Sequence, residues 1–119
     1  MINAIDIAYA AGLFEGEGTL RIDRYFRTRK GEKRVRITPQ LKLRVCMTDE
    51  APVRRFAVIF NGRVHGPYQY SKGVKSKEHY KPYWLADVDS PPMVSLAIRE
   101  MWSFLSPRRQ EQLKVGYSL

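Results

Sequence analysis

The chain has 119 residues, 44% of them hydrophobic, and carries 21 Lys and Arg against 12 Asp and Glu, a net charge of +9. This length fits one domain over residues 1–119, no apolar run reaches membrane-spanning length, and the single Cys46 excludes a disulfide framework or a cysteine-based zinc cluster. The excess of positive charge favours a phosphate-bearing partner and argues against a membrane protein.

The first predicted element is a helix over residues 4–14, rich in Ala, Ile and Leu, for which Asn3 and Asp6 form a capping pair. The helix runs into Glu15 and Glu17, two acids separated by one glycine. Carboxylates are disfavoured at the negative end of a helix dipole, so we expect a cation there, and a divalent metal is the usual candidate. The alternative is a glycine-rich helix end without chemistry.

Small residues recur along one face of this helix. Ala8, Gly12 and Gly16 stand at every fourth position. Such a stripe lets a second helix approach closely, and a surface helix of a monomer rarely needs it. The pattern therefore predicts that this helix pairs with another one.

Residues 19–29 and 34–47 predict two strands joined by a polar turn, with apolar and polar residues alternating along both. Pro39 predicts a bulge or an outward-facing edge in the second strand. Residues 19–47 hold ten basic and two acidic side chains. A twisted ribbon of this kind can enter the DNA major groove, and the alternative is a solvated sheet face. The polar-face residues assigned to DNA are Arg21, Asp23, Tyr25, Arg27, Arg29, Arg34, Arg36, Thr38, Gln40, Lys42 and Arg44.

Thr48 and Asp49 predict the cap of a second helix over residues 50–60. A second hairpin is predicted from strands at residues 64–70 and 79–88. Its aromatic and cationic side chains suit a phosphate backbone, and neither histidine is interpreted as a metal ligand. The residues of this hairpin assigned to DNA are Tyr68, Tyr70, Lys72 and Lys81.

Ser90 predicts the start of a third helix that reaches about Leu105, and Ser106 predicts the start of a last short helix. The order of elements is therefore helix, two strands, helix, two strands and helix, followed by a tail. This αββαββα order predicts an α+β fold in which two hairpins form one antiparallel saddle.

Residues 10–18, Ala-Ala-Gly-Leu-Phe-Glu-Gly-Glu-Gly, resemble the LAGLIDADG signature of homing endonucleases. Gly12 and Gly18 stand at its two glycine positions, and Glu15 and Glu17 replace its two aspartates. The resemblance implies the same αββαββα fold and a pairing of motif helices, with the penultimate acid, Glu17, as a metal ligand at the helix base. Because the chain has one signature and no internal repeat, a homodimer is implied. The implied interface residues are Ala8, Gly12, Leu13 and Gly16.

The resemblance further implies Mg²⁺-dependent cleavage of both strands of a palindromic or near-palindromic DNA, with Ca²⁺ or Mn²⁺ as substitutes in binding or cleavage. Glu17 and Gly16 are the implied metal ligands. A basic residue near the scissile phosphate is implied at Arg108 or at the neighbouring Arg109. Arg holds a phosphate well but is a poorer proton shuttle than the family's Lys. A polar catalytic residue is implied at Asp49, or at Gln40 in a shifted register, and for Asp49 a capping role alone is the alternative.

Two other classes of function stay open on the sequence. A non-cleaving relative of this fold could act as a DNA-binding regulator or as an RNA-binding helper of intron splicing. A ribosome-associated basic protein would explain the charge but not the acidic helix end. For the nuclease we expect a gene in a mobile intron or a phage, and a cytoplasmic protein in a prokaryotic host or an organellar one, since no signal peptide is predicted.

Overall fold

The computed structural model describes residues 2–27, 30–31, 36–69 and 81–117. Its helices are α1 (Ala4–Glu17), α2 (Glu50–Ile59), α3 (Pro91–Met101) and α4 (Pro107–Tyr117), with a 3-10 turn, η2 (Trp102–Phe104), between the last two. Its strands are β1 (Gly18–Arg27), β2 (Arg36–Met47), β3 (Arg63–Tyr68) and β4 (Tyr83–Val88). The predicted αββαββα order is confirmed, and α4 follows it as the predicted last helix. None of the helices in these ranges is both long and apolar enough to cross a membrane.

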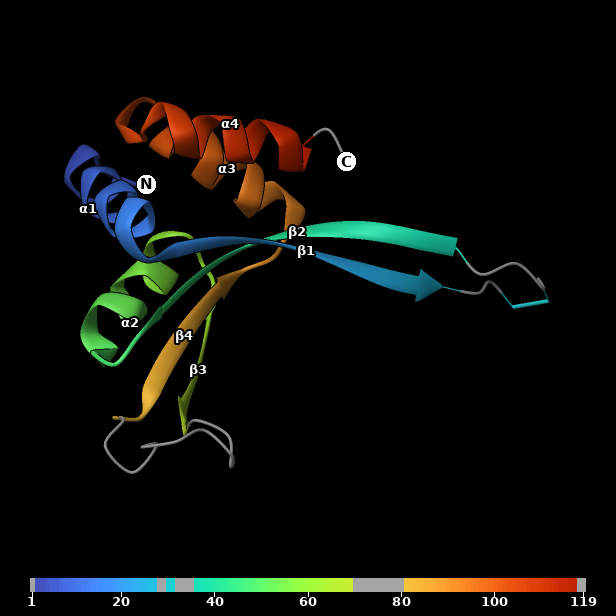
Figure 1. Cartoon of the computed structure of the whole chain (residues 1–119), viewed down its shortest axis with the longest axis horizontal. Coiled ribbons are helices and arrows are strands. Elements are labelled where there is room, and N and C mark those ends of the chain that lie inside the picture. Colours follow the sequence, from blue (N-terminus) through green and yellow to red (C-terminus); the bar gives the residue numbers. More distant parts are fainter. Residues whose placement is uncertain (1, 28–29, 32–35, 70–80, 118–119) are drawn as a thin grey trace.

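The four strands form one antiparallel sheet in the order β1-β2-β4-β3. β1 and β2 pair without a break from Gly18 opposite Val45 to Arg27 opposite Arg36. At the centre, β2 pairs with β4 over five positions that begin with Leu43 opposite Val88. Figure 1 shows that the β1–β2 ribbon and the β3–β4 hairpin point in different directions, while the helices lie together on one side of the sheet. The predicted saddle is therefore present.

Alternation along the strands decides which face of the saddle meets the helices. Leu43 and Val45 of β2 are fully buried, whereas Arg44 between them lies on the opposite, open face. Across the helix layer, the rings of Phe14 and Phe56 stack with centroids 6.4 Å apart. The buried core comprises Ile7, Ala10, Ala11, Phe14, Leu43, Val45, Val53, Phe56, Ala57, Phe60, Ala86, Val88, Val94, Ala97, Ile98, Met101, Leu105 and Leu113.

Pro39 lies at an edge and makes no bulge. It stands opposite Arg24 in the unbroken β1–β2 register. The pairing of β2 with β4 begins only at Leu43, so at Pro39 one edge of β2 has no neighbouring strand in the described ranges. A proline can be accommodated there because its missing N–H removes no hydrogen bond from the sheet.

Two predicted boundaries were wrong. β4 begins at Tyr83 rather than at residue 79, so Lys81 precedes the strand, and residues 70–80 lie outside the described ranges. The third helix ends at Met101 rather than near Leu105, because the chain tightens into η2. Leu105 then adopts an extended conformation and remains buried, which redirects the chain into α4.

Candidate active site and nucleic-acid interface

The end of α1 places Glu17 at the junction between helix and saddle. At the start of this helix, the Asn3 side chain accepts a hydrogen bond from the N–H of Asp6 at 2.8 Å, as predicted. At its end, the N–H of Gly18 donates to the carbonyl oxygen of Phe14, and β1 begins at once. A Cβ atom at Gly18 would lie 2.3 Å from the Phe14 ring. The abrupt change from helix to strand therefore needs glycine here.

The Glu17 carboxylate is exposed, and no side chain in the described ranges forms an ion pair with it. It borders a hollow whose other lining residues include Cys46 and Tyr83. An unpaired carboxylate at the negative end of a helix suits a hard divalent cation, which prefers oxygen ligands. The described ranges contain no group of three or more His, Cys, Asp or Glu that could hold a metal. Glu17 is therefore a carboxylate that could contribute to a metal site, and the described residues do not group it with two further ligands of these types.

Glu15, in contrast, is bound within its own chain. Its carboxylate accepts the N–H of Ser106 at 2.6 Å and the Ser106 hydroxyl at 3.0 Å. Arg108 and Arg109 approach the same carboxylate at 3.8 and 3.9 Å. The N–H of Ser106 is the largest cause that lowers the pKa of Glu15, and the two arginines act in the same direction. Glu15 thus serves the start of α4, and the two motif acids have different roles.

The lowered pKa of Glu15 predicts how the stability of the fold changes with pH. A carboxylate whose pKa is lower in the folded state stabilises the fold above its unfolded pKa, and this contribution is lost as the pH falls through the folded-state pKa. We expect Glu15→Gln to lower the urea midpoint at neutral pH. The difference from wild type should shrink as the pH falls below the ordinary glutamate value of 4.5. A difference that stays constant down to acid pH would contradict this role.

Arg109 provides the cation that the end of α1 was predicted to need. Its side chain is buried, and Nη2 donates to the carbonyl oxygens of Gly18 at 2.7 Å and of Glu15 at 3.2 Å. Nη1 donates to Oε1 of Gln112 at 2.8 Å, and the guanidinium lies 5.1 Å from the centroid of the Phe14 ring. An arginine of this chain therefore binds the carbonyl oxygens of Glu15 and Gly18, and a metal at Glu17 stays a prediction.

The two arginines proposed for the scissile phosphate differ in availability. Arg109 is committed to backbone carbonyls, and burial is the main cause that lowers its pKa. The Arg108 side chain is 70% exposed, and its one described ion pair is the long contact to Glu15. Of the two, Arg108 is the one that can turn toward a phosphate, and its catalytic role stays a prediction.

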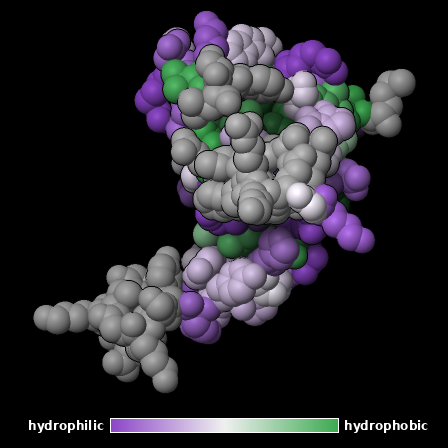
Figure 2. All heavy atoms as spheres, turned by 90° about the vertical axis from the view of Figure 1, so that its right-hand side faces the viewer, coloured by the Kyte–Doolittle hydropathy of each residue, from purple (hydrophilic) through white to green (hydrophobic). Residues whose placement is uncertain are grey.

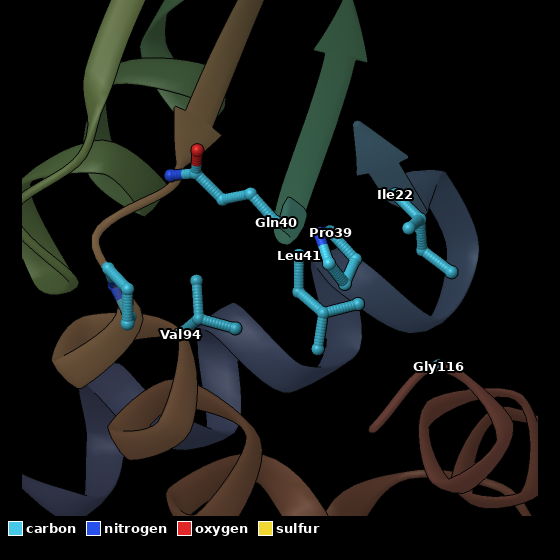
Figure 3. A pocket seen from close by; sticks show the side chains of 7 residues that line it. Ile22, Pro39, Gln40, Leu41, Val94 and Gly116 are labelled. Carbon is cyan, nitrogen blue, oxygen red and sulfur yellow. The ribbon is translucent and has the colours of Figure 1, made fainter. Parts of the chain in front are cut away.

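Both candidates for the polar catalytic residue make structural hydrogen bonds. Asp49 accepts the N–H of Ala51 at 3.3 Å and is the N-cap of α2. Gln40 donates from Nε2 to the carbonyl oxygen of Asp89 at 2.7 Å. Figure 3 shows Gln40 extending toward the end of β4, beside a cavity of about 300 Å³, while Leu41 points toward the helices. Their catalytic roles also stay predictions.

On the β1–β2 ribbon, Asp23, one of the predicted DNA contacts, forms ion pairs with two basic side chains. Asp23 lies between Lys42, whose Nζ is 2.9 Å from Oδ2, and Arg21, whose Nη2 is 3.6 Å from Oδ1. The hydrogen bond from Lys42 is the largest cause that lowers the pKa of Asp23. Of the described basic side chains of the ribbon, Lys42 and Arg21 are therefore paired with an acid of the same ribbon.

For several predicted DNA contacts, the position of the side chain or of the whole residue is not described. Tyr25 is opposite Thr38 and Arg27 is opposite Arg36 in the ribbon register, and the positions of these four side chains are not described. Tyr68 and Lys81 are exposed, and the Tyr68 ring lies 5.7 Å from that of Tyr83. The predicted contacts outside the described ranges are Arg29, Arg34, Tyr70 and Lys72. Figure 2 shows hydrophilic side chains at many outer edges of this side of the molecule, with smaller hydrophobic patches among them.

Asp87 of β4 is a residue of the open face that the sequence analysis did not select. It is 6% exposed and binds Arg44 of the neighbouring β2 through two hydrogen bonds, Nε to Oδ1 at 2.7 Å and Nη2 to Oδ2 at 2.9 Å. Nε2 of His65, on the other side, is 4.0 Å from Oδ2. Alternation along β4 could have indicated this acid, since Trp84, Ala86 and Val88 were predicted to face inward.

The small-residue stripe of α1 is open to solvent. Ala8, Gly12 and Gly16 are exposed, and a Cβ atom built on either glycine would meet nothing within 4 Å. Leu13 at the margin is half-buried. Ile5, which is 75% exposed and three residues before Ala8, extends the same stripe and was missed by the sequence analysis. The face is therefore apolar, small and uncovered within one chain.

With this geometry established, the class of fold can be assigned. The chain has the fold of LAGLIDADG homing endonucleases, as its likeness to several solved structures shows. No protein-family model and no curated protein matches the sequence. The family resemblance of residues 10–18 is thus supported at the level of the fold.

All four of these structures are complexes with DNA. The group I intron-encoded homing endonuclease I-CeuI matches with a TM-score of 0.63, at 13% identity over 99% of this chain and 55% of that one. The LAGLIDADG meganuclease I-CpaMI, bound to uncleaved DNA, matches with 0.64, at 15% identity over 94% and 36%. I-CvuI, with uncleaved DNA in the presence of Mg, matches with 0.60, at 15% identity over 94% and 65%. The present chain thus spans less than two thirds of each of them.

Proposed function

We propose that this protein is a site-specific homing endonuclease that acts as a homodimer and makes a metal-dependent double-strand break in palindromic or near-palindromic DNA. The observation that carries the proposal is the Glu17 carboxylate, exposed and unpaired in the described ranges, at the base of a helix with an open stripe of small residues. The basic saddle begins at the next residue. The DNA complexes of proteins with the same fold support DNA as the partner.

Mg²⁺ is the cofactor that this site suits. The Glu17 carboxylate and the Gly16 carbonyl oxygen are the groups of this chain that would hold it. When bound, such an ion lowers the pKa of water and stabilises the charge on a leaving oxygen. The chain itself contributes the rigid junction between α1 and β1, where Arg109 binds the carbonyls of Glu15 and Gly18. The exposed Arg108 is placed to neutralise a phosphate.

A second copy of the chain completes the site in this proposal. Mg²⁺ is usually held by one or two carboxylates, substrate phosphates and several waters, so a second Glu17 and the DNA would complete its coordination. Pairing two α1 helices through Ile5, Ala8, Gly12 and Gly16 would bring their Glu17 ends together. A two-fold interface repeats the saddle on each side, so the target should have two related half-sites.

The test is cleavage by the purified protein. With Mg²⁺ and a library of palindromic duplexes, we expect both strands of a small set of sequences to be cut, and EDTA to stop cutting. Ca²⁺ in place of Mg²⁺ should allow the same duplexes to be recovered bound. If the protein binds selected duplexes yet cuts none of them with Mg²⁺ or Mn²⁺, the nuclease proposal fails and a non-cleaving DNA-binding role replaces it.

The proposed interface makes a separate prediction at Gly16. A Cβ atom at Gly16 would meet nothing within 4 Å in its own subunit, so Gly16→Leu should keep the helical content of the wild type. Overpacking a helix contact costs about 1–3 kcal/mol, which corresponds to a dimer weakened by roughly fivefold to a hundredfold. Sedimentation velocity over a range of concentrations measures the change.

The matched control for this substitution is Gly116→Ala in α4. A Cβ atom at Gly116 would stand 2.5 Å from the Cδ2 methyl group at the end of the Leu20 side chain, so a small shift of Leu20 accommodates this variant, which should leave the helix pairing of α1 in place. An unchanged dimer in Gly16→Leu would put the interface on another face.

A further inference from the structure

The buried carboxylate of Asp87 fixes Arg44 in one orientation on the open face of the saddle. Arginine has five N–H donors, and the contact to Asp87 uses Nε–H and one N–H of Nη2. Two N–H groups on Nη1 and one on Nη2 remain, on the outer edge of the same planar group. The hydrogen bond that Arg44 donates to Asp87 is also the largest cause that raises the pKa of Arg44, whose guanidinium is charged in any case.

The outer edge of the Arg44 guanidinium fits the hydrogen-bond acceptors of one base, guanine. Guanine presents O6 and N7 in the major groove, and two parallel N–H groups of an arginine bind this pair of acceptors. A guanidinium already held by a carboxylate loses less conformational freedom when it binds. Beside Arg44, a hollow of about 380 Å³ lined by Tyr68, Tyr83 and Leu85 opens on the same face. It gives the edge of a base pair room next to the arginine.

We propose that Asp87 is a specificity-determining residue: without touching DNA, it orients Arg44 so that the outer edge of the guanidinium reads one guanine in each half-site. The inference rests on the proposed function, because it requires a DNA duplex on the saddle. Asp87 acts as a positioning residue, and Arg44 makes the contact.

A neighbouring ion pair on the same side of the sheet offers a matched control. Asp89 holds Arg63 at 2.8 Å, but the Arg63 side chain is 70% exposed, whereas that of Arg44 is 24% exposed. Asp87→Asn and Asp89→Asn are the same substitution and add the same charge to the protein. Exposed pairs contribute little to orientation, since water competes for both partners. Only Asp87→Asn should therefore change which bases are preferred.

The experiment selects duplexes from a pool with random half-sites, in Ca²⁺ so that binding is measured without cutting, and then replaces each base pair of the selected site in turn. For wild type we expect one G·C pair per half-site whose replacement weakens binding by roughly tenfold to a hundredfold. In Asp87→Asn that penalty should fall to about threefold or less. Affinity for unrelated DNA should rise, because the charge of Arg44 is no longer neutralised.

The outcomes separate this inference from the proposed function. If Asp87→Asn keeps the full penalty, or if Asp89→Asn loses it equally, Asp87 has no special role and the inference fails while DNA binding stands. If wild type selects no duplex at all, both fail. Should Asp87→Asn not fold, Arg44→Lys decides the question. Loss of the penalty with unrelated DNA still bound supports the reading of guanine by Arg44, and an undiminished penalty overturns it.

Discussion

Replacing Glu17 by Gln is expected to abolish double-strand cleavage while duplex binding in Ca²⁺ persists. The amide keeps the size of the side chain and removes the charge that would attract a divalent ion to the end of α1. A metal stabilises a transition state by several kcal/mol, and each 1.4 kcal/mol is about tenfold in rate, so the loss should be about a thousandfold or more. Cleavage of the selected duplex, followed on a denaturing gel over time, measures it.

Glu15→Gln is the matched control for this loss, because it removes the same charge from the same helix two residues earlier. Glu15 is bound to Ser106 rather than directed at a shared site, so cleavage should be retained at neutral pH wherever the variant is folded. If Glu17→Gln still cuts at the wild-type rate, Glu17 is not the metal ligand. If folded Glu15→Gln loses cleavage, the division of roles between the two acids is wrong.

The second large effect is on stability, at Arg109. We expect Arg109→Met to lower the free energy of unfolding by about 2–5 kcal/mol, since each buried acceptor left without its donor costs about 1–3 kcal/mol. Methionine fills much of the same space, but it leaves the carbonyl oxygens of Glu15 and Gly18 without their donor. Urea unfolding followed by circular dichroism measures the difference.

Arg108 provides the comparison, since it is the same residue type one position earlier on the same helix. Its side chain is 70% exposed and makes only a long contact to Glu15, so Arg108→Met should change the unfolding free energy by about 0.5 kcal/mol or less. Equal losses in the two variants would contradict the role of Arg109 at the end of α1. A loss of cleavage in folded Arg108→Met would support its predicted place near the phosphate.

Much of the fold could be predicted because its signals are local. The hydrogen bond between Asn3 and Asp6, and the buried positions Val53 and Phe56 in α2, follow the helical period that the sequence displays. Alternation along β2 likewise separated the core face from the open face. The start of β4 could not be placed in this way, because strand ends depend on the partner strand, and the β3–β4 register shifts between His65 and Tyr68.

The candidate site was predictable only in part. The position of Glu17 followed from the motif, whereas the engagement of Glu15 depends on Ser106, 91 residues further along the chain. The hydrogen-bonded ion pair of Arg44 and Asp87 joins residues 43 positions apart, on two strands that are not consecutive in the sequence. A periodic pattern cannot predict such contacts between distant residues, since it indicates only which face of a single segment is buried.

The sequence by itself therefore determined the order of the elements, the stripe of small residues on α1 and the acid at its end, because these depend on residue type and spacing within one segment. Only the tertiary structure decided which charged side chains remain available to bind a ligand. Packing α4 against the end of α1 occupies Glu15 with Ser106, and the terminal carbonyls of α1 with Arg109. Glu17 is left exposed because the chain turns at Gly18 into a strand that leads away from these partners.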